Sequence, residues 1–215
     1  LIGGGIAFSH QYRFAAVEVV DKDYAPKAIS IILLAGIGSA FIGPNVANIS
    51  KGIVPDHMYA GSYLALAILA ILSTVFLFFY QEPKKPSNVQ YETGRSFFEL
   101  ISQPKFLQAL IASAFAYAVM TFLMTATPIS MHLMENISLS KTGFVIQFHI
   151  AAMFLPSLVT GHLVKKFGHS KIMYAGVLLF LVTIITSLFE QNFNNYLIAL
   201  IFLGLGWNFL FISGT

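Results

Sequence analysis

The amino-acid sequence predicts an all-α membrane protein, a polytopic bundle of about seven transmembrane helices. Of its 215 residues, 57% are hydrophobic and 10% are charged, and its mean hydropathy is +0.77. An average soluble domain carries about 25% charged residues, and a soluble fold with so few could not cover its surface with polar groups. Uncharged runs of about 20 residues, long enough to cross a bilayer as helices, recur along the chain. None of them alternates as a barrel strand does.

The composition and the missing motifs exclude several classes of function. The composition is unlike that of a cytosolic enzyme, a disordered chain or a nucleic-acid-binding module. Cysteine is absent, so there is no disulfide, thiolate metal site or cysteine nucleophile. The chain contains no Walker loop, no HExxH zinc motif and no GxSxG serine elbow. We therefore predict no enzymatic activity, no metal site, no cofactor and no nucleic-acid partner.

The first three predicted spans cover residues 1–20, 28–50 and 58–81. Arg13 and Glu18 interrupt the first span, whereas the other two carry no charge. Small residues in the second span would let a neighbouring helix approach closely, and Pro44 predicts a kink there. The middle of the third span is almost entirely aliphatic or phenylalanine, which favours a lipid-facing helix.

A charged segment separates these spans from the rest of the chain. Residues 82–105 contain seven charged residues, and we predict that they form a cytoplasmic linker between residues 1–81 and residues 106–215. The end of this linker, residues 96–101, forms either a short interfacial helix before Pro104 or a solvated loop. Both ends of the chain lie inside apolar runs, so we expect it to be part of a longer protein.

Four further spans are predicted at residues 106–134, 142–164, 172–189 and 192–215. Pro128 and Pro156 predict kinks in the first two of these spans. The span at 172–189 is nearly free of polar groups in its middle, which favours a position against lipid.

Lysine and arginine are distributed unevenly between the two predicted sides. Nine fall on one side, namely Lys22, Lys27, Lys84, Lys85, Arg95, Lys105, Lys165, Lys166 and Lys171. Two, Lys51 and Lys141, fall on the other. Because basic residues accumulate in cytoplasmic loops, the first side is predicted to be cytoplasmic and the second to face outward.

Arg13 is the most informative residue of the first span. It lies about seven residues from the cytoplasmic end, or about 10 Å deep at 1.5 Å per residue, and an arginine in hydrocarbon costs at least ~2.5 kcal/mol unless it faces protein, water or a partner. His10 lies on the same stripe of the helix, and Gln11 and Glu18 share a neighbouring stripe. In one interpretation Arg13 and His10 face a water-filled cavity, where they bind an anionic or polar solute or affect proton movement. In the other, Arg13 snorkels to the interface or pairs with Glu18.

Other spans also contain polar side chains. The residues expected to bind a solute are His10, Gln11, Arg13, Tyr117, Gln147, Trp207 and Asn208. His149 is either a packing residue or a proton carrier. Asn45 and Asn48 are polar positions of the second span, whereas a threonine inside a span more often bonds its own backbone.

Two motifs resemble those of the major facilitator superfamily of secondary transporters. The segment GHLVKKFGHSK at 161–171 is similar to the second-half copy of the family's cytoplasmic signature. Its motif positions are Gly161, Lys165, Lys166, Gly168 and Lys171, and Lys165 stands where the family usually has an acid. The segment GIGSAFIGP at 36–44, which ends in Gly43 and Pro44, resembles the glycine–proline motif of the fifth helix, which is associated with antiporters.

This resemblance implies that the seven spans are helices four to ten of a twelve-helix protein. Glu18 resembles the acid at the cytoplasmic end of the fourth helix, which holds the inner gate, and Lys165 and Lys166 would help close the same side. Residues 2–8 resemble residues 203–209, which agrees with a parallel repeat of six-helix halves.

We therefore expect a secondary active transporter of the bacterial inner membrane that moves a small solute by alternating access, coupled to protons or another ion. Its partners would be that solute, the coupling ion and membrane lipids, and Arg13 predicts negative charge on the solute or on a paired residue. Two other classes stay open. One is an intramembrane enzyme that uses His10, Arg13 and His149, and the other is a receptor or scaffold that binds a solute without moving it.

Overall fold

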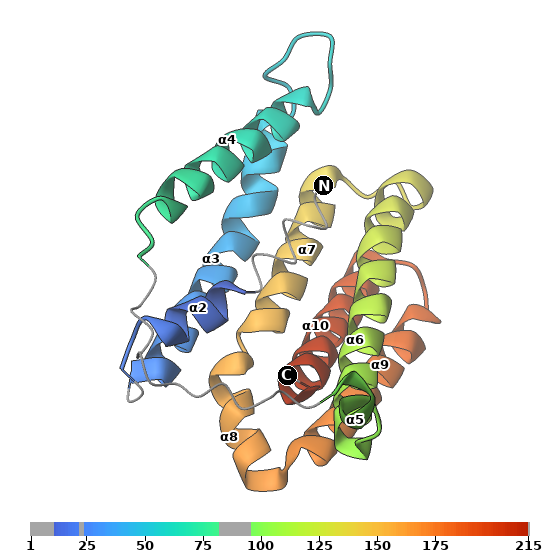
Figure 1. Cartoon of the computed structure of the whole chain (residues 1–215). Coiled ribbons are helices and arrows are strands. Elements are labelled where there is room, and N and C mark those ends of the chain that lie inside the picture. The colour runs from blue at the N-terminus through green and yellow to red at the C-terminus, as the bar shows by residue number, and fades with distance from the viewer. Residues whose placement is uncertain (1–10, 22–23, 82–95, 215) are drawn as a thin grey trace.

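The computed structural model describes residues 11–21, 24–81 and 96–214 (Figure 1). His10 and the predicted repeat at residues 2–8 lie outside the described residues, as does most of the linker. Seven helical positions are described by their backbone alone, namely Arg13, Ala25, Pro26, Lys27, Ile29, Ser30 and Leu33. Throughout the described part the secondary structure is helical, which confirms the predicted fold class.

The first group of helices comprises α2 (Tyr12–Glu18), α3 (Ala25–Ser50) and α4 (Ala60–Leu77). Proline in the first turn of α3 suits a helix start, where its missing N–H has no partner to lose. α3 continues past Pro44, the position of a predicted kink. α3 and α4 form an antiparallel hairpin (Figure 1), in which Ser62 Oγ donates to the Ala47 carbonyl at 2.7 Å.

The second group begins with α5 (Phe97–Ile101), a short helix whose N-cap is Ser96. This structure confirms the helical alternative for the end of the linker. Then follow α6 (Pro104–Ile129), a π-helical turn η2 (Ser130–Met134), α7 (Leu139–Phe154), α8 (Ser157–Phe167), α9 (His169–Ser187) and α10 (Phe193–Gly214).

Two prolines of this group coincide with the predicted irregularities. The π-turn begins directly after α6, two residues past Pro128. Pro156 separates α7 from α8, because a proline cannot donate to the helical ladder. The span predicted at 142–164 is therefore two helices with a break between them.

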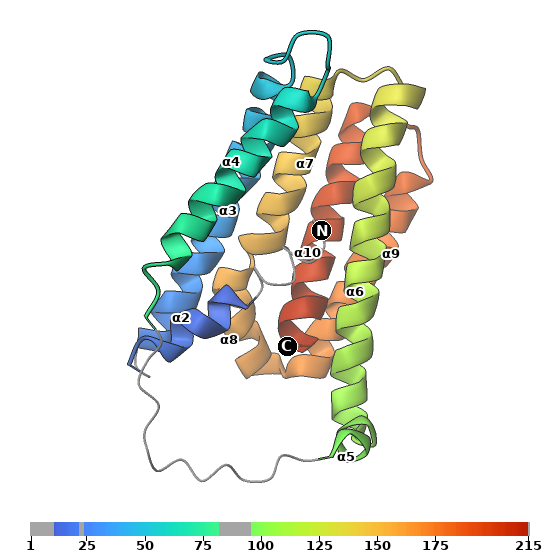
Figure 2. The same ribbon diagram turned by 45° about the horizontal axis from the view of Figure 1, so that its top comes forward.

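α10 forms the centre of the second group, packed against α6, α7 and α9 (Figure 2). Its buried residues include Leu203, Trp207 and Leu210, each at most 2% exposed. Small residues allow close approach: a Cβ on Gly206 would lie 2.9 Å from the Gly176 carbonyl oxygen on α9. A Cβ on Gly204 would likewise lie 2.6 Å from the carbonyl oxygen of His149 on α7.

The outer surface of the bundle is strongly apolar. α4 buries almost none of its side chains, and Phe76 is 68% exposed. In water this surface would be unfavourable, whereas hydrocarbon tolerates apolar side chains around helices that satisfy their own backbone groups. Among the described residues, five helical segments are long and apolar enough to cross a membrane: Ala60–Leu77, Pro104–Met134, Leu139–Phe167, His169–Ser187 and Phe193–Gly214. The protein is therefore an integral membrane protein.

The two helix groups meet where α3 lies beside α7, as both ribbon views show (Figures 1 and 2). The α3–α4 and α6–α7 connections lie at one end of the bundle, and the α8–α9 connection lies at the other (Figure 1). The lysine distribution predicts that the first end faces outward and the second faces the cytoplasm. The proposed division into residues 1–81, 82–105 and 106–215 stays a prediction.

Candidate functional site

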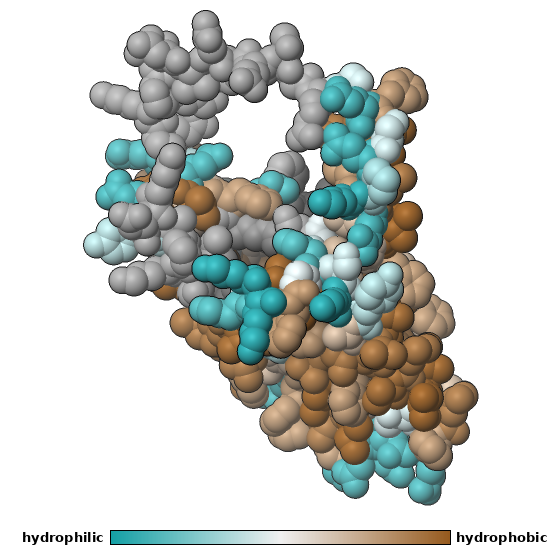
Figure 3. Space-filling view, turned by 90° about the horizontal axis from the view of Figure 1, so that it is seen from below, coloured by the Kyte–Doolittle hydropathy of each residue, from teal (hydrophilic) through white to brown (hydrophobic). Residues whose placement is uncertain are grey.

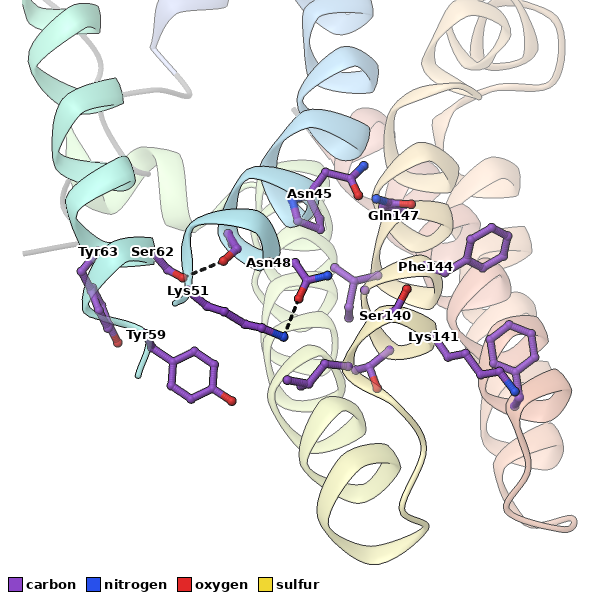
Figure 4. A pocket seen from close by; sticks show the side chains of 17 residues that line it. Asn45, Asn48, Lys51, Tyr59, Ser62, Tyr63, Ser140, Lys141, Phe144 and Gln147 are labelled. Atoms are coloured by element: carbon purple, nitrogen blue, oxygen red, sulfur yellow. Dashed lines mark hydrogen bonds between the residues drawn. The ribbon is translucent and has the colours of Figure 1, made fainter. Parts of the chain in front are cut away.

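A cavity of about 860 Å³ opens between α3, α4 and α7, at the end of the bundle that is predicted to face outward. Its size lies in the range typical of small-molecule sites, about 300–1,000 Å³. Both helix groups contribute to its wall: the first through α3 and α4, and the second through α7 and through Phe193 at the start of α10. The side chains that line it are mostly amides, hydroxyls and aromatic rings (Figure 4).

α3 presents a row of polar side chains to this cavity. Asn45, Asn48 and Lys51 are spaced three residues apart, so they follow one face of the helix. Asn45 Nδ2 donates to the carbonyl of Phe41 at 2.8 Å, and Lys51 Nζ donates to Asn48 Oδ1 at 3.0 Å. These local bonds hold the two amides in place along the cavity wall.

α7 supplies the opposite wall. Gln147 is 9% exposed, and Figure 4 shows its side chain and that of Asn45 pointing toward one another across the space between α3 and α7. Nearer the start of α7, Lys141 Nζ lies 5.8 Å from the centre of the Phe193 ring, an arrangement typical of a cation–π contact. The cavity thus combines facing amides with two cations at its mouth.

Aromatic rings support the α7 wall and join it to its neighbours. Phe144 packs against Phe148 with ring centres 4.5 Å apart and against Phe193 at 6.1 Å. Phe148 in turn meets Phe41 on α3 edge-on at 6.3 Å. The two helix groups therefore contact each other through the apolar rings of Phe41 and Phe148, next to the polar cavity.

Two of the predicted solute-binding residues meet in a separate aromatic cluster. The rings of Tyr117 on α6 and Trp207 on α10 lie edge-on at 5.6 Å, and Trp207 stacks on Phe211 at 4.7 Å. The indole is 2% exposed, and its Nε1 has no partner among the described residues. Tyr117 also borders a hollow of about 750 Å³ along α6 that Thr121 and Thr125 share. The roles of Tyr117 and Trp207 in solute binding stay predictions.

Asn208 lies away from both cavities, at the break between α7 and α8. It is fully buried, and its Nδ2 donates to the carbonyl of Met153 at 2.7 Å and to Ser157 Oγ. Thr160 Oγ1 donates to Asn208 Oδ1 at 2.7 Å. The side chain thus satisfies polar groups at the break, and a role in solute binding stays a prediction.

His149 is buried in the contact between α7 and α10. Its Nδ1 lies 2.8 Å from the carbonyl oxygen of Leu200, so the geometry requires a proton on Nδ1 and leaves Nε2 as an acceptor in the neutral ring. No described residue bonds to Nε2. A role for His149 in proton movement is untested.

The remaining predicted residues lie toward the other end of the bundle or along α2 and α3. Gln11 lies directly before α2, and Glu18 is its last residue; both are exposed. The side chain of Arg13 lies outside the described residues. Gly43 and Pro44 lie within α3, where Pro44 borders the large cavity.

The residues of the 161–171 motif lie around the connection between α8 and α9. Lys165 and Lys166 occupy the last turn of α8, and Gly168, with φ 85°, forms the sharp connection to α9. Gly161 lies within α8 and Lys171 in the first turn of α9.

Of the residues predicted to bind a solute, Gln147 alone lines the large cavity, and Pro44, predicted as a motif residue, borders it. Asn45 and Asn48 were predicted only as polar positions of their span, and the other lining residues were not predicted. The signal available for α3 was the spacing of Asn45, Asn48 and Lys51, three polar residues on one face at the end of an apolar span. Tyr59 and Phe193 carried no such signal, because their position at the cavity depends on how the loops and helices pack against one another. The described residues contain no group of three or more His, Asp or Glu side chains able to hold a metal ion.

A sequence model of the Major Facilitator Superfamily matches residues 3–215. The riboflavin transporter RfnT of Brucella anthropi is 38% identical over 211 residues, which cover 97% of this chain and 53% of the relative. Two uncharacterized MFS-type transporters of Bacillus subtilis, YddS and YdeG, are 30% and 29% identical across the whole chain, covering 53% and 54% of their own lengths. The chain spans about half the length of the curated relatives it matches. No solved structure matches it.

Proposed function

The chain belongs to the Major Facilitator Superfamily, and from that premise we propose that the whole protein is a secondary active transporter that moves a small solute by alternating access. The observation that carries this proposal is the cavity between α3 and α7, because its two walls come from different helix groups. If the two helix groups rock against each other as rigid bodies, access to this cavity changes while the helices themselves stay intact. Amides that face each other across such a joint can bind a solute in one arrangement and release it in the other.

The aromatic and amide walls of the cavity suit a flat heterocycle with polar substituents, and two lysines, Lys51 and Lys141, also line it. Phe144 and Tyr63 provide aromatic surface, and Asn45, Asn48 and Gln147 provide donors and acceptors. Riboflavin combines a planar ring system that has carbonyl and ring-nitrogen acceptors with a tail of hydroxyl groups. Since one relative is named a riboflavin transporter, we take riboflavin as the first candidate solute. An anionic solute bound by Arg13 is the competing candidate.

Ion coupling, most simply to protons, forms a further part of the proposal. His149 is a titratable side chain buried at the α7–α10 contact, where gain or loss of a proton would alter how the two helices pack. The glycine–proline pair at Gly43–Pro44 supports exchange rather than one-way movement, and Pro44 borders the cavity. The bacterial relatives support a location in the bacterial inner (plasma) membrane.

Counterflow in liposomes tests the transport proposal. The complete protein is reconstituted into vesicles loaded with unlabelled riboflavin, and labelled riboflavin is added outside. A transporter accumulates label transiently, whereas a receptor or scaffold binds riboflavin without accumulation. Gln147→Leu should lower the initial rate, and Asn194→Leu, a change at an exposed residue outside the cavity, serves as its control. Absence of counterflow with riboflavin, but its presence with an anionic solute, would favour the Arg13 hypothesis.

A further inference from the structure

The side chain of Gln147 ends in a buried amide that the described part of the chain leaves without a partner. The residue is 9% exposed and lines the cavity between α3 and α7. Asn45 points toward it from α3 (Figure 4), yet no hydrogen bond joins the two side chains, and no other described residue bonds to the Gln147 amide. The oxygen and nitrogen of this amide are not enclosed by protein. A molecule in the cavity can therefore reach them.

The other two amides of the cavity are each partly engaged within the protein. Asn45 Nδ2 donates to the carbonyl oxygen of Phe41 on its own helix at 2.8 Å. Asn48 Oδ1 accepts from Lys51 Nζ at 3.0 Å. Among the described residues of this cavity, Gln147 is thus the amide that keeps both of its polar ends for a ligand, an oxygen that accepts and an –NH₂ group that donates.

The surroundings of the bundle make a hydrogen bond to this amide selective. On the face of the molecule seen from below, hydrophilic residues adjoin extensive hydrophobic flanks (Figure 3), as at a membrane interface. Hydrocarbon rather than water therefore surrounds the flanks, and an unpaired polar group inside the protein is unfavourable there. A solute without a matching group would leave the amide unpaired, so the cavity should discriminate against it.

α7 also leaves space for a flat ring beside this amide. Gly143 lines the same cavity and lies one helical turn before Gln147 on the same face of α7. A Cβ added at Gly143 would meet no atom within 4 Å, so the helix surface is open at this point. A planar ring that rests on this surface can direct its edge toward the amide.

An amide with both ends available matches one kind of ring edge best. A ring N–H beside a ring carbonyl presents a donor and an acceptor side by side, and a carboxamide pairs with such an edge through two parallel hydrogen bonds, as glutamine does with adenine. A hydroxyl group or an isolated carbonyl does not present this pair. The free amide therefore favours a cyclic amide over a solute that offers only hydroxyl groups.

From these features we propose that the cavity recognises its solute by a cyclic-amide edge. Gln147 Nε2 donates to a ring carbonyl, the adjacent ring N–H donates to Gln147 Oε1, and the ring lies against α7 at Gly143. This inference rests on the function proposed above for the same cavity and narrows its class of substrate. Riboflavin, the first candidate solute, carries such an edge where its N3–H lies between two ring carbonyls. Its ribityl tail is attached to the middle ring and takes no part in this recognition.

Binding of two flavins to the complete protein in detergent tests the proposed edge, with flavin fluorescence as the readout. Lumiflavin keeps the N3–H but has a methyl group in place of the ribityl tail, and 3-methyllumiflavin has a methyl group on N3 as well. The wild type should bind lumiflavin about tenfold more tightly, because the N3 methyl group removes one hydrogen bond and hinders the second. In Gln147→Leu the two Kd values should be equal, since leucine bonds to neither edge.

Gly143→Leu tests the place of the ring. The new side chain fills the open space, so the Kd of lumiflavin should rise about tenfold. The Tm of the unliganded variant should match the wild type, because a Cβ at this position meets no described atom. Asn194→Leu is the matched control for both leucine variants, since it introduces leucine at an exposed residue outside the cavity. It should leave the Kd values of both flavins unchanged.

Equal binding of lumiflavin and 3-methyllumiflavin by the wild type would overturn the inference. A preference that survives in Gln147→Leu, or the absence of flavin binding, would overturn it as well. Riboflavin counterflow, measured on the same preparation in liposomes, separates this inference from the proposed function. Selective binding without counterflow would support the cyclic-amide edge and refute riboflavin transport, whereas counterflow without selective binding would support transport and refute the edge.

Discussion

Asn208 on α10 donates a hydrogen bond from its Nδ2 to the carbonyl oxygen of Met153, 2.7 Å away at the end of α7. Proline at 156 interrupts the helix just beyond this point, and a helix end has carbonyl groups without intrahelical partners. The amide of one helix therefore satisfies the broken backbone of another. Breaks of this kind are tolerated at membrane depth only where neighbouring groups restore the lost hydrogen bonds.

Replacement of Asn208 should therefore destabilise the protein. Asn208→Ala would leave the Met153 carbonyl and the Thr160 hydroxyl without this partner, at a cost of about 1–3 kcal/mol. We expect a lower Tm in detergent than for Asn194→Ala, a matched change at an exposed asparagine. An unchanged Tm combined with a weaker affinity for solute would instead support the predicted binding role of Asn208.

The contact between α9 and α10 should not tolerate an added methyl group. In Gly206→Ala the new Cβ would lie 2.6 Å from the Phe180 ring and 2.9 Å from the Gly176 carbonyl oxygen, and overpacking of this kind costs about 1–3 kcal/mol. The Tm should fall. Gly38→Ala on α3, where a Cβ would meet no atom within 4 Å, should keep or raise the Tm, and equal losses in both variants would contradict the predicted close contact.

The facing amides Asn45 and Gln147 should act on the same solute. Each change to leucine should raise the KM for riboflavin about fivefold, since one hydrogen bond contributes about 1 kcal/mol. If both amides contact the solute independently, the double variant should multiply the two effects. If they only bind one another, the double variant will be no worse than either single one, and a direct role in solute binding would be refuted.

Cysteine labelling tests the predicted orientation, because this chain contains no cysteine. Ser140→Cys lies at the end predicted to face outward, and Ser102→Cys lies beside α5 at the opposite end. Both serines are exposed. In intact cells that carry an otherwise cysteine-free protein, a membrane-impermeant maleimide should label the first variant, and the second only after permeabilisation. The reverse pattern would show that the lysine distribution has been assigned to the wrong sides.

Several features were predictable because the bilayer leaves the backbone few choices. A span in hydrocarbon must satisfy its own N–H and C=O groups, so long uncharged runs become helices. Pro156 broke its helix as the missing N–H requires, and Ser96 capped the short helix before α6. α3 nevertheless continues through Pro44, which shows that a proline can be accommodated within a span.

The sequence by itself determined the membrane class, the helical spans and the family resemblance, since hydropathy and local motifs need no knowledge of distant contacts. Only the tertiary structure decided which polar side chains meet. Asn45 faces Gln147 (Figure 4), and Asn208 reaches Met153, through contacts between helices far apart along the chain. The physical reason is that lipid is as apolar as a neighbouring helix, so a span that is apolar on all sides carries little record of which side its neighbour occupies.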